Sequence, residues 1–333
     1  MAMPATAPDL ALPALDVRAL ARRAAVPGAV GAVAVAAFVA AGGPAQAFAH
    51  ALSRALHADW RWVAVAAVSE LLSFAGYVAL LWLVAGRATA RMGLRESVEV
   101  TLGGAAATRL MPTGGVGGAA LTLWALGRSG LGTRGAGRTL LTFLVLLYAV
   151  FLGAIAFAGG ALALDATGPL ALTAIPAGLA LAGIAVALSL GLRHREHAAR
   201  PVGRVRSGAH LLGEAVQEAL RVVRSRDWRL LGAVAWWAFD AGVLYAMLSA
   251  FGADVPVLVV VLGYFVGQAG NLIPIPGAVS GGLAGVLLAF GIDADVAIVS
   301  VLGYRAVAIW LPAPLGLAAL ASLRTTLARW AAA

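Results

Sequence analysis

The sequence predicts an all-α polytopic integral membrane protein, with about six transmembrane helices and two re-entrant helical hairpins of opposite orientation in an inverted repeat. The first observation is composition: 62% of the 333 residues are hydrophobic and 12% are charged, against about 25% charged in soluble domains. The second observation is a set of apolar stretches long enough to cross a bilayer. The third is that the same order of spans and interrupted apolar regions occurs in both halves of the chain. This composition excludes a water-soluble globule and a disordered chain.

Six apolar stretches are long enough for transmembrane helices. A helix needs about 20 apolar residues to cross the hydrocarbon core of a bilayer. The stretches are approximately 26–43, 62–86, 139–164, 169–192, 230–252 and 295–323. The last contains Pro312 and Pro314, so we expect a kink there. The first is short and follows three Arg, so a cleaved signal peptide is the alternative to a retained anchor.

Two further apolar regions, 97–128 and 255–291, are interrupted in the middle. The interruptions are LMPTGG at 110–115 and LIPIPG at 272–277, and each half is too short to cross. Pro removes a backbone donor and Gly permits positive φ, so both residues stop a helix. A broken helix inside a membrane is tolerated where protein or a water-filled cavity receives the freed backbone groups. We therefore expect a first and a second re-entrant hairpin in these regions.

The basic residues predict how the chain is oriented. All 24 are Arg, and with a cytoplasmic N-terminus 20 fall in cytoplasmic segments, two outside and two in the membrane. This is the positive-inside distribution of a multi-pass protein of the cell membrane, with both termini cytoplasmic. The first hairpin then enters from the cytoplasm and the second from the exterior. The net charge of +9 is an orientation signal, and we expect no nucleic-acid partner.

Each half contains two spans, a hairpin and a third span. Because each half crosses the membrane three times, the second half has the opposite orientation to the first. Tyr77 follows Trp60-Arg61 at the same spacing at which Tyr245 follows Trp228-Arg229. Both hairpin tips have the pattern Leu-x-Pro-x-x-Gly. Inverted repeats with broken helices at the midplane are typical of transporters. The expected organisation is a cytoplasmic segment 1–25, repeat 26–164, repeat 165–322 and a cytoplasmic tail 323–333.

The second repeat contains a basic cytoplasmic segment, 193–229, with an amphipathic stretch. A helix there places four apolar side chains near one face: Leu212, Val216, Leu220 and Val223. Since Arg221, Arg224 and Arg226 lie nearby, we expect this face to lie on the anionic inner leaflet. The alternative is a helix packed on the protein's own cytoplasmic surface.

Several motifs resemble a known family. They are Asn271–Gly277, the Gly-rich stretch ending in Phe290-Gly291, Gly303-Tyr304-Arg305, Trp310-Leu311-Pro312 and, in the first hairpin, Thr108–Pro112. These residues resemble the lysylphosphatidylglycerol synthase transmembrane family of flippase-like membrane domains, and the resemblance covers the chain from the first span onward. It implies movement of a lipid with an anionic or sugar-bearing head group between leaflets. Members often carry a Glu shortly after the second tip, where this chain has Gly281, Gly282 and Leu283.

Four ionisable residues fall at membrane depth: Glu70, Arg109, Asp240 and Arg305. An isolated charge at the bilayer centre costs at least about 2.5 kcal/mol on insertion scales, so pairing or a water-filled cavity is expected. We assign Glu70 and Asp240 to ion pairing or coupling. Two structural ion pairs that hold helices together are the alternative.

The hairpin tips are the expected substrate site. Each brings a helix N-terminus, with its unpaired N–H groups, toward the midplane, where Arg adds a bidentate fork for phosphate. The expected binding residues are Arg109, Arg305, Pro112, Thr113, Gly114, Gly115, Asn271, Pro274, Pro276, Gly277 and Ser280. Thr108 and Gln268 complete the polar lining.

The expected function is translocation of an anionic phospholipid or a polyprenyl-phosphate-linked glycan. One alternative is a secondary transporter for a small solute or ion. Another is a non-transporting module that partners a glycosyltransferase or lipid synthase. With no Cys and no visible nucleophile–base pair or metal set, we expect no enzyme activity, cofactor or metal.

Overall fold

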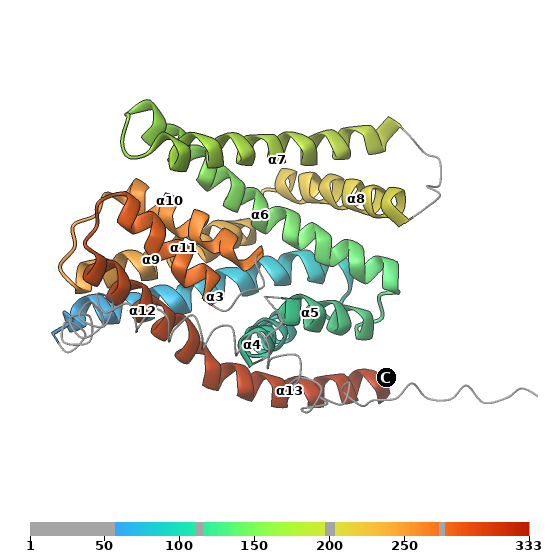
Figure 1. The fold of residues 1–333 in the computed structure, drawn as a ribbon. Helices are drawn as coiled ribbons and strands as arrows, with labels where there is room; N and C mark the ends of the chain where they lie inside the picture. Colours follow the sequence, from blue (N-terminus) through green and yellow to red (C-terminus); the bar gives the residue numbers. More distant parts are fainter. Residues whose placement is uncertain (1–56, 111–115, 197–203, 273–276, 333) are drawn as a thin grey trace, which may run out of the picture.

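The computed structural model describes residues 57–110, 116–196, 204–272 and 277–332. The regular elements in these ranges are helices (Figure 1). They are α3 Trp60–Ala88, α4 Leu94–Leu110, α5 Val116–Arg128, α6 Thr133–Leu164, α7 Leu170–Glu196, α8 Arg204–Arg224, α9 Leu231–Ala250, α10 Val257–Gln268, α11 Ala278–Ala289, α12 Ala294–Trp310 and α13 Pro312–Ala332, with short 3-10 turns at Trp228–Leu230 and Ala269–Leu272.

Within the described residues, five helical segments are long and apolar enough to cross a membrane, which confirms a helical polytopic membrane protein. They are Trp60–Ala88, Thr133–Leu164, Leu170–Leu192, Trp228–Ala250 and Ala294–Trp330. The predicted span 26–43 lies outside the described residues. The last segment breaks between α12 and α13 at Leu311, beside the prolines that predicted a kink. Pro312 is tolerated as the first residue of α13 because its missing N–H would have no partner within the helix.

α3 and α9 form an antiparallel pair in the middle of the bundle (Figure 1). The N–H of Asp59, at the start of α3, donates to the carbonyl of Ala250, at the end of α9, over 3.0 Å. Near the other end, the Arg229 guanidinium lies 4.4 Å from the centre of the Trp82 ring. Between these contacts the backbones touch, since a Cβ built on Gly76 would lie 2.7 Å from the Gly232 carbonyl oxygen.

The sequence Asp-Trp-Arg begins both segments. Asp59 accepts a hydrogen bond from the backbone N–H of Arg61 over 2.9 Å, and Asp227 accepts one from that of Arg229 over 3.0 Å. Each aspartate thus satisfies an N–H that has no partner within the helix. Asp227 also binds the Arg229 guanidinium, at 3.0 and 2.8 Å. The Arg229 hydrogen bonds and the charge of Arg87 lower the pKa of Asp227 to about 2.

Each predicted hairpin region contains two packed helices that meet through glycines. In α4 and α5, a Cβ on Gly118 would lie 3.0 Å from the Gly104 oxygen. In α10 and α11, a Cβ on Gly282 would lie 3.2 Å from the Cα of Gly267. The Thr89 hydroxyl donates to the Ser129 carbonyl over 3.1 Å, so the chain enters α4 beside the point where it leaves α5. α4 packs on α13, and α10 packs on α6.

The predicted amphipathic stretch forms α8, and part of its apolar face is turned toward α6 and α7. The buried residues are Ala215, Val216, Ala219 and Val222. A Cβ on Gly191 of α7 would lie 2.7 Å from a Val216 methyl, so the two helices are in close contact. Of the four side chains expected on the apolar face, Val216 is buried against α7, Leu212 and Leu220 are partly exposed, and Val223 is 51% exposed. The protein therefore covers only part of this face, and docking of the exposed part on the inner leaflet stays a prediction. Periodicity identifies an apolar face without identifying what covers it.

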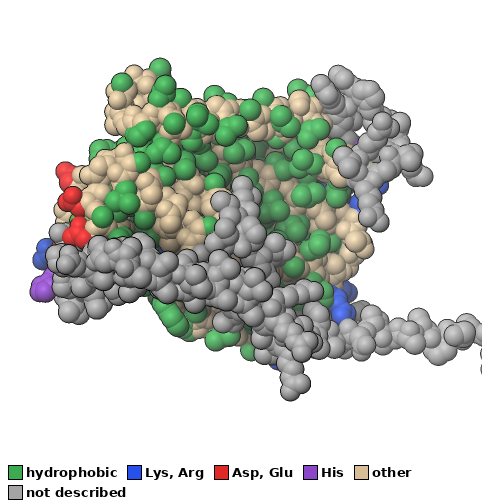
Figure 2. Space-filling model, viewed as in Figure 1, with side chains coloured by type: hydrophobic (Ala, Val, Ile, Leu, Met, Phe, Trp, Pro, Cys, Tyr) green, Lys and Arg blue, Asp and Glu red, His purple; other side chains and the backbone are tan. Residues whose placement is uncertain are grey.

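Charges are separated along the long axis of the bundle. Figure 2 shows acidic side chains gathered at its left edge and most of the visible basic ones at its right. We call the first the acidic end; its residues are Asp59, Asp165, Asp254, Asp293 and Asp295. We call the second the basic end; its residues include Arg87, Arg91, Arg95, Arg128 and Arg134.

The contact between α3 and α9 predicts a large difference between two glycine substitutions. Gly76→Ala should lower the melting temperature by several degrees, because its methyl would lie 2.7–2.8 Å from Gly232, Ala235 and Trp236, and overpacking costs about 1–3 kcal/mol. Gly153→Ala in α6 is the matched control, since nothing lies within 4 Å of its Cβ. Thermal unfolding in detergent, followed by tryptophan fluorescence, measures both. Equal shifts would contradict the close contact.

The pKa of Asp227 predicts a pH-dependent contribution to stability. Because it is lowered from 3.8 to about 2, the charged carboxylate stabilises the fold above about pH 4 and this stabilisation is lost as the pH falls toward 2. Asp227→Asn keeps the helix cap but not the charge. Its melting temperature should lie a few degrees below wild type at pH 7, and the gap should narrow between pH 4 and pH 2. Asp59→Asn, at the other cap, is the control, and a gap independent of pH would refute the assignment.

Candidate functional site

A carboxylate and two tyrosines meet inside the bundle. Asp240 of α9 accepts hydrogen bonds at one oxygen, Oδ2, from the hydroxyl of Tyr264 and, over 3.3 Å, from that of Tyr304. These tyrosines belong to α10 and α12, and all three side chains are buried. Polar groups at this depth are stable only when they are hydrogen-bonded, and the two hydroxyls supply donors for the carboxylate. The cluster therefore joins three helices.

The hydrogen bonds continue from this cluster to the end of α10. The Gln268 amide nitrogen donates to the Tyr304 hydroxyl over 2.9 Å. The Asn271 amide nitrogen in turn donates to the Gln268 amide oxygen over 2.8 Å. Asn271 is exposed, and Asp240 is only 8% exposed. A chain of side-chain hydrogen bonds thus links a buried carboxylate to an exposed polar group beside the second hairpin tip.

A second polar contact lies at the start of α11. Nε of Arg305, in α12, donates to the Ser280 hydroxyl over 3.1 Å. Gly277 precedes α11 with φ +83°, a left-handed conformation that glycine adopts without a Cβ penalty. A Cβ on Gly270 would lie 2.8 Å from Ala278, so the residues before and after the tip are in contact. The predicted residues Asn271, Gly277, Ser280 and Arg305 therefore come together around this tip.

Glu70 brings a second carboxylate from α3. It is 2% exposed, and its helix packs on α9 and α12, which carry Asp240 and Tyr304. The described hydrogen bonds join Asp240 to tyrosines and Arg305 to Ser280. The role of the acids in ion pairing or coupling stays a prediction.

The first hairpin contributes less to the described site. Six predicted residues lie outside the described part of the chain: Pro112, Thr113, Gly114, Gly115, Pro274 and Pro276. Arg109 lies in the last turn of α4, where the backbone is described. Thr108 donates to the Gly104 carbonyl and accepts from the Gly118 N–H, at 2.9 and 2.8 Å. It therefore connects α4 to α5 instead of joining the cluster around Asp240.

Sequence reasoning missed Tyr264. A signal was available, because a buried tyrosine needs a partner for its hydroxyl, and a tyrosine inside the apolar Val257–Gln268 is as informative as a charge. Tyr264 also lies four residues before Gln268, so the two share a helix face. Tyr304 was noted only as part of a motif.

An aromatic layer packs the second hairpin against the rest of the bundle. The ring of Trp237 lies 5.5 Å from that of Phe265 and 5.0 Å from that of Phe151, and these two phenylalanines are 5.1 Å apart. The Trp237 ring N–H donates to the Leu147 carbonyl over 2.8 Å. α6, α9 and α10 are therefore held together by apolar contacts beside the buried tyrosines.

Comparison with known families returns a match over residues 24–316 to the family described as the lysylphosphatidylglycerol synthase TM region. Comparison with curated proteins gives no match. The matched residues include the five candidate spans up to Gly316, both hairpin regions and every residue of the polar network described above. The chain therefore belongs to the lysylphosphatidylglycerol synthase transmembrane-region family, which confirms the resemblance.

Proposed function

We propose that this protein translocates a lipid with an anionic phosphate or sugar-phosphate head group between the leaflets of the cell membrane. One observation carries the proposal: a chain of hydrogen bonds runs from the buried Asp240 to the exposed Asn271, in a bundle whose helices expose apolar side chains. Polar groups at such depth are costly and mark substrate pathways in membrane proteins. Membership of a membrane-region family named for a lipid synthase supports a lipid substrate.

The second tip supplies the groups that such a head group needs. The Arg305 guanidinium offers a planar fork that matches two phosphate oxygens. The N-terminus of α11, which begins after Gly277, adds backbone N–H groups and the positive end of a helix dipole. Ser280 and Asn271 can bind further oxygens or sugar hydroxyls. The acyl tails would remain in the bilayer.

The geometry of the bundle supports an inverted repeat with two re-entrant hairpins as the transport scaffold. α3 and α9 are antiparallel and begin with the same capped tripeptide. Each hairpin region has a glycine contact between its two helices. Each also packs on the last helix of the other half, α4 on α13 and α10 on α6. Rocking of the halves would expose the tips alternately, with the basic end cytoplasmic by the positive-inside rule.

Translocation of labelled lipids in proteoliposomes tests the function. Wild type should move fluorescent phosphatidylglycerol, or a polyprenyl phosphate, to the opposite leaflet faster than empty vesicles do. Arg305→Gln should slow this about tenfold, because a charge-assisted hydrogen bond contributes about 1.5–3 kcal/mol. Arg324→Gln, an exposed position on α13, is the matched control. Rates unaffected by Arg305→Gln would reject this site, and flux of a small anion without lipid movement would favour a solute transporter.

Single cysteines in a chain without native cysteine test the opposed hairpins. Thr113→Cys should react with an impermeant maleimide only from the side of the basic end. Asn271→Cys should react only from the side of the acidic end; it is preferred to Gly277, whose positive φ disfavours any side chain. Ser225→Cys and Thr167→Cys, both exposed, calibrate the two sides in right-side-out and inverted vesicles. Labelling of both tips from one side would exclude opposed hairpins.

A further inference from the structure

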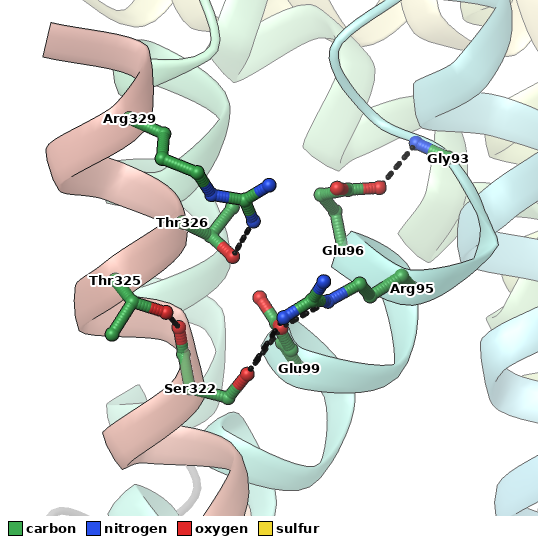
Figure 3. Close-up of polar contacts among 8 residues, drawn as sticks. All are labelled: Gly93, Arg95, Glu96, Glu99, Ser322, Thr325, Thr326 and Arg329. Carbon is green, nitrogen blue, oxygen red and sulfur yellow. Dashed lines mark hydrogen bonds and ion pairs between the residues drawn. The ribbon is translucent and has the colours of Figure 1, made fainter. Parts of the chain in front are cut away.

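A group of polar side chains joins α4 to α13 at the basic end (Figure 3). Glu99 of α4 is only 4% exposed, and one of its oxygens, Oε1, accepts two hydrogen bonds. One comes from Nε of Arg95 over 3.0 Å, and the other comes from the Ser322 hydroxyl of α13 over 2.6 Å. We call Arg95, Glu99 and Ser322 the clamp. The carboxylate thus links one turn of α4 to the facing turn of α13.

Further contacts make α4 and α13 a close pair. A terminal nitrogen of Arg91 donates to the Trp330 carbonyl over 3.4 Å. Deeper in the bundle, a Cβ on Gly316 would lie 2.7 Å from both the Ala106 side chain and the Leu102 carbonyl oxygen. The two helices therefore touch through backbone at their inner ends and through polar side chains at their outer ends.

α13 has few attachments to the rest of the described bundle besides α4. It packs mainly on α4, and its connection to α12 is the break at Leu311, where Pro312 restarts the helix. A helix that follows such a break can change direction without breaking its own hydrogen bonds. α4 also packs on α3, and α5 packs on α6, so a movement of α4 with α13 relative to α12 would shift these contacts as well.

The other hairpin is attached in a different way. α10 packs on α6 and α9 through Phe265, Phe151 and Trp237, and separating these rings would expose apolar surface. The clamp is polar, and its partly exposed members can exchange protein partners for water at low net cost. Single polar groups can therefore adjust the attachment of the first hairpin at the outer end of α4, whereas its inner end is held by the backbone contact at Gly316.

We propose that Glu99 is a positioning residue: the clamp fixes the first hairpin to α13, so that both move as one body about the α12–α13 break. α4 carries Arg109 in its last turn, and Glu99 lies near the other end of the same helix. The position and tilt of α4, and with them the backbone position of Arg109 in its last turn, then depend on the clamp. The consequence for transport rests on the proposed function, whereas the clamp itself does not.

Glu96 provides a matched control on the same helix. It lies three residues before Glu99, and Figure 3 shows it turned toward the loop that precedes α4. Its carboxylate accepts from the Gly93 N–H over 3.1 Å, which caps α4 without bridging to α13. Glu96→Gln and Glu99→Gln therefore make the same chemical change on the same helix, and only the second affects the clamp.

Spin labels measure the clamp without any transport. Leu94→Cys on α4 and Ala328→Cys on α13 are exposed, and the chain has no native cysteine. Pulsed electron paramagnetic resonance on the full chain in nanodiscs should give a broader and longer distance distribution for Glu99→Gln and for Ser322→Ala, and an unchanged one for Glu96→Gln. Distributions equal to wild type in both clamp variants would overturn the proposal.

A double-mutant cycle measures whether the clamp acts through Arg109. If it does, Glu99→Gln should slow lipid translocation about tenfold in the wild-type background and less than about twofold in an Arg109→Gln background, because residues that act as a unit are not additive. Equal effects in both backgrounds would overturn the positioning role and leave a merely structural contact. If wild type moves no lipid, the proposed function fails, and the spin-label distances still decide whether the clamp exists.

Discussion

The backbone contact between α3 and α9 is the constraint on which the rest of the structure depends. Without a Cβ at Gly76 and Gly232, two long helices approach until their main chains touch. Lipid tails are as apolar as leucine, so helices in a membrane associate through such close packing and through hydrogen bonds. The Ser73 hydroxyl adds one of these by donating to the Trp236 carbonyl over 2.9 Å. Because the pair is antiparallel, the elements that follow each helix start from opposite ends of the bundle.

This arrangement explains how polar groups are tolerated inside an apolar bundle. Asp240 projects from α9 and Glu70 from α3, and the helices that return from opposite ends bring hydroxyls, amides and Arg305 to the same region. In this network each described hydrogen bond joins residues of two different helices or turns. The network therefore exists only when several helices are in place, and it makes their relative positions interdependent.

Much of the fold was predictable because it follows from local properties. Span length follows from apolar runs, the α12–α13 break from Pro312, and the start of α11 from Gly277, whose positive φ suits glycine. The residues Asn271, Ser280 and Arg305 were found because polar groups are rare in apolar surroundings. Tyr264 and the clamp at Glu99 were not predicted. A tyrosine within an apolar stretch resembles an ordinary hydrophobic residue, and a glutamate close to an Arg in the sequence resembles an ordinary solvent-exposed charge.

The sequence by itself determined that the chain belongs in a membrane, approximately where its long apolar helices lie, and which residues are too polar for their surroundings. These are properties of single residues and of short periodic patterns. Only the tertiary structure decided what each side chain meets: it packed Val216 of α8 against α7, joined Asp240 to two tyrosines, and set Glu99 against Ser322. A side chain's partner lies up to 239 positions away in the chain, and no local pattern encodes that contact.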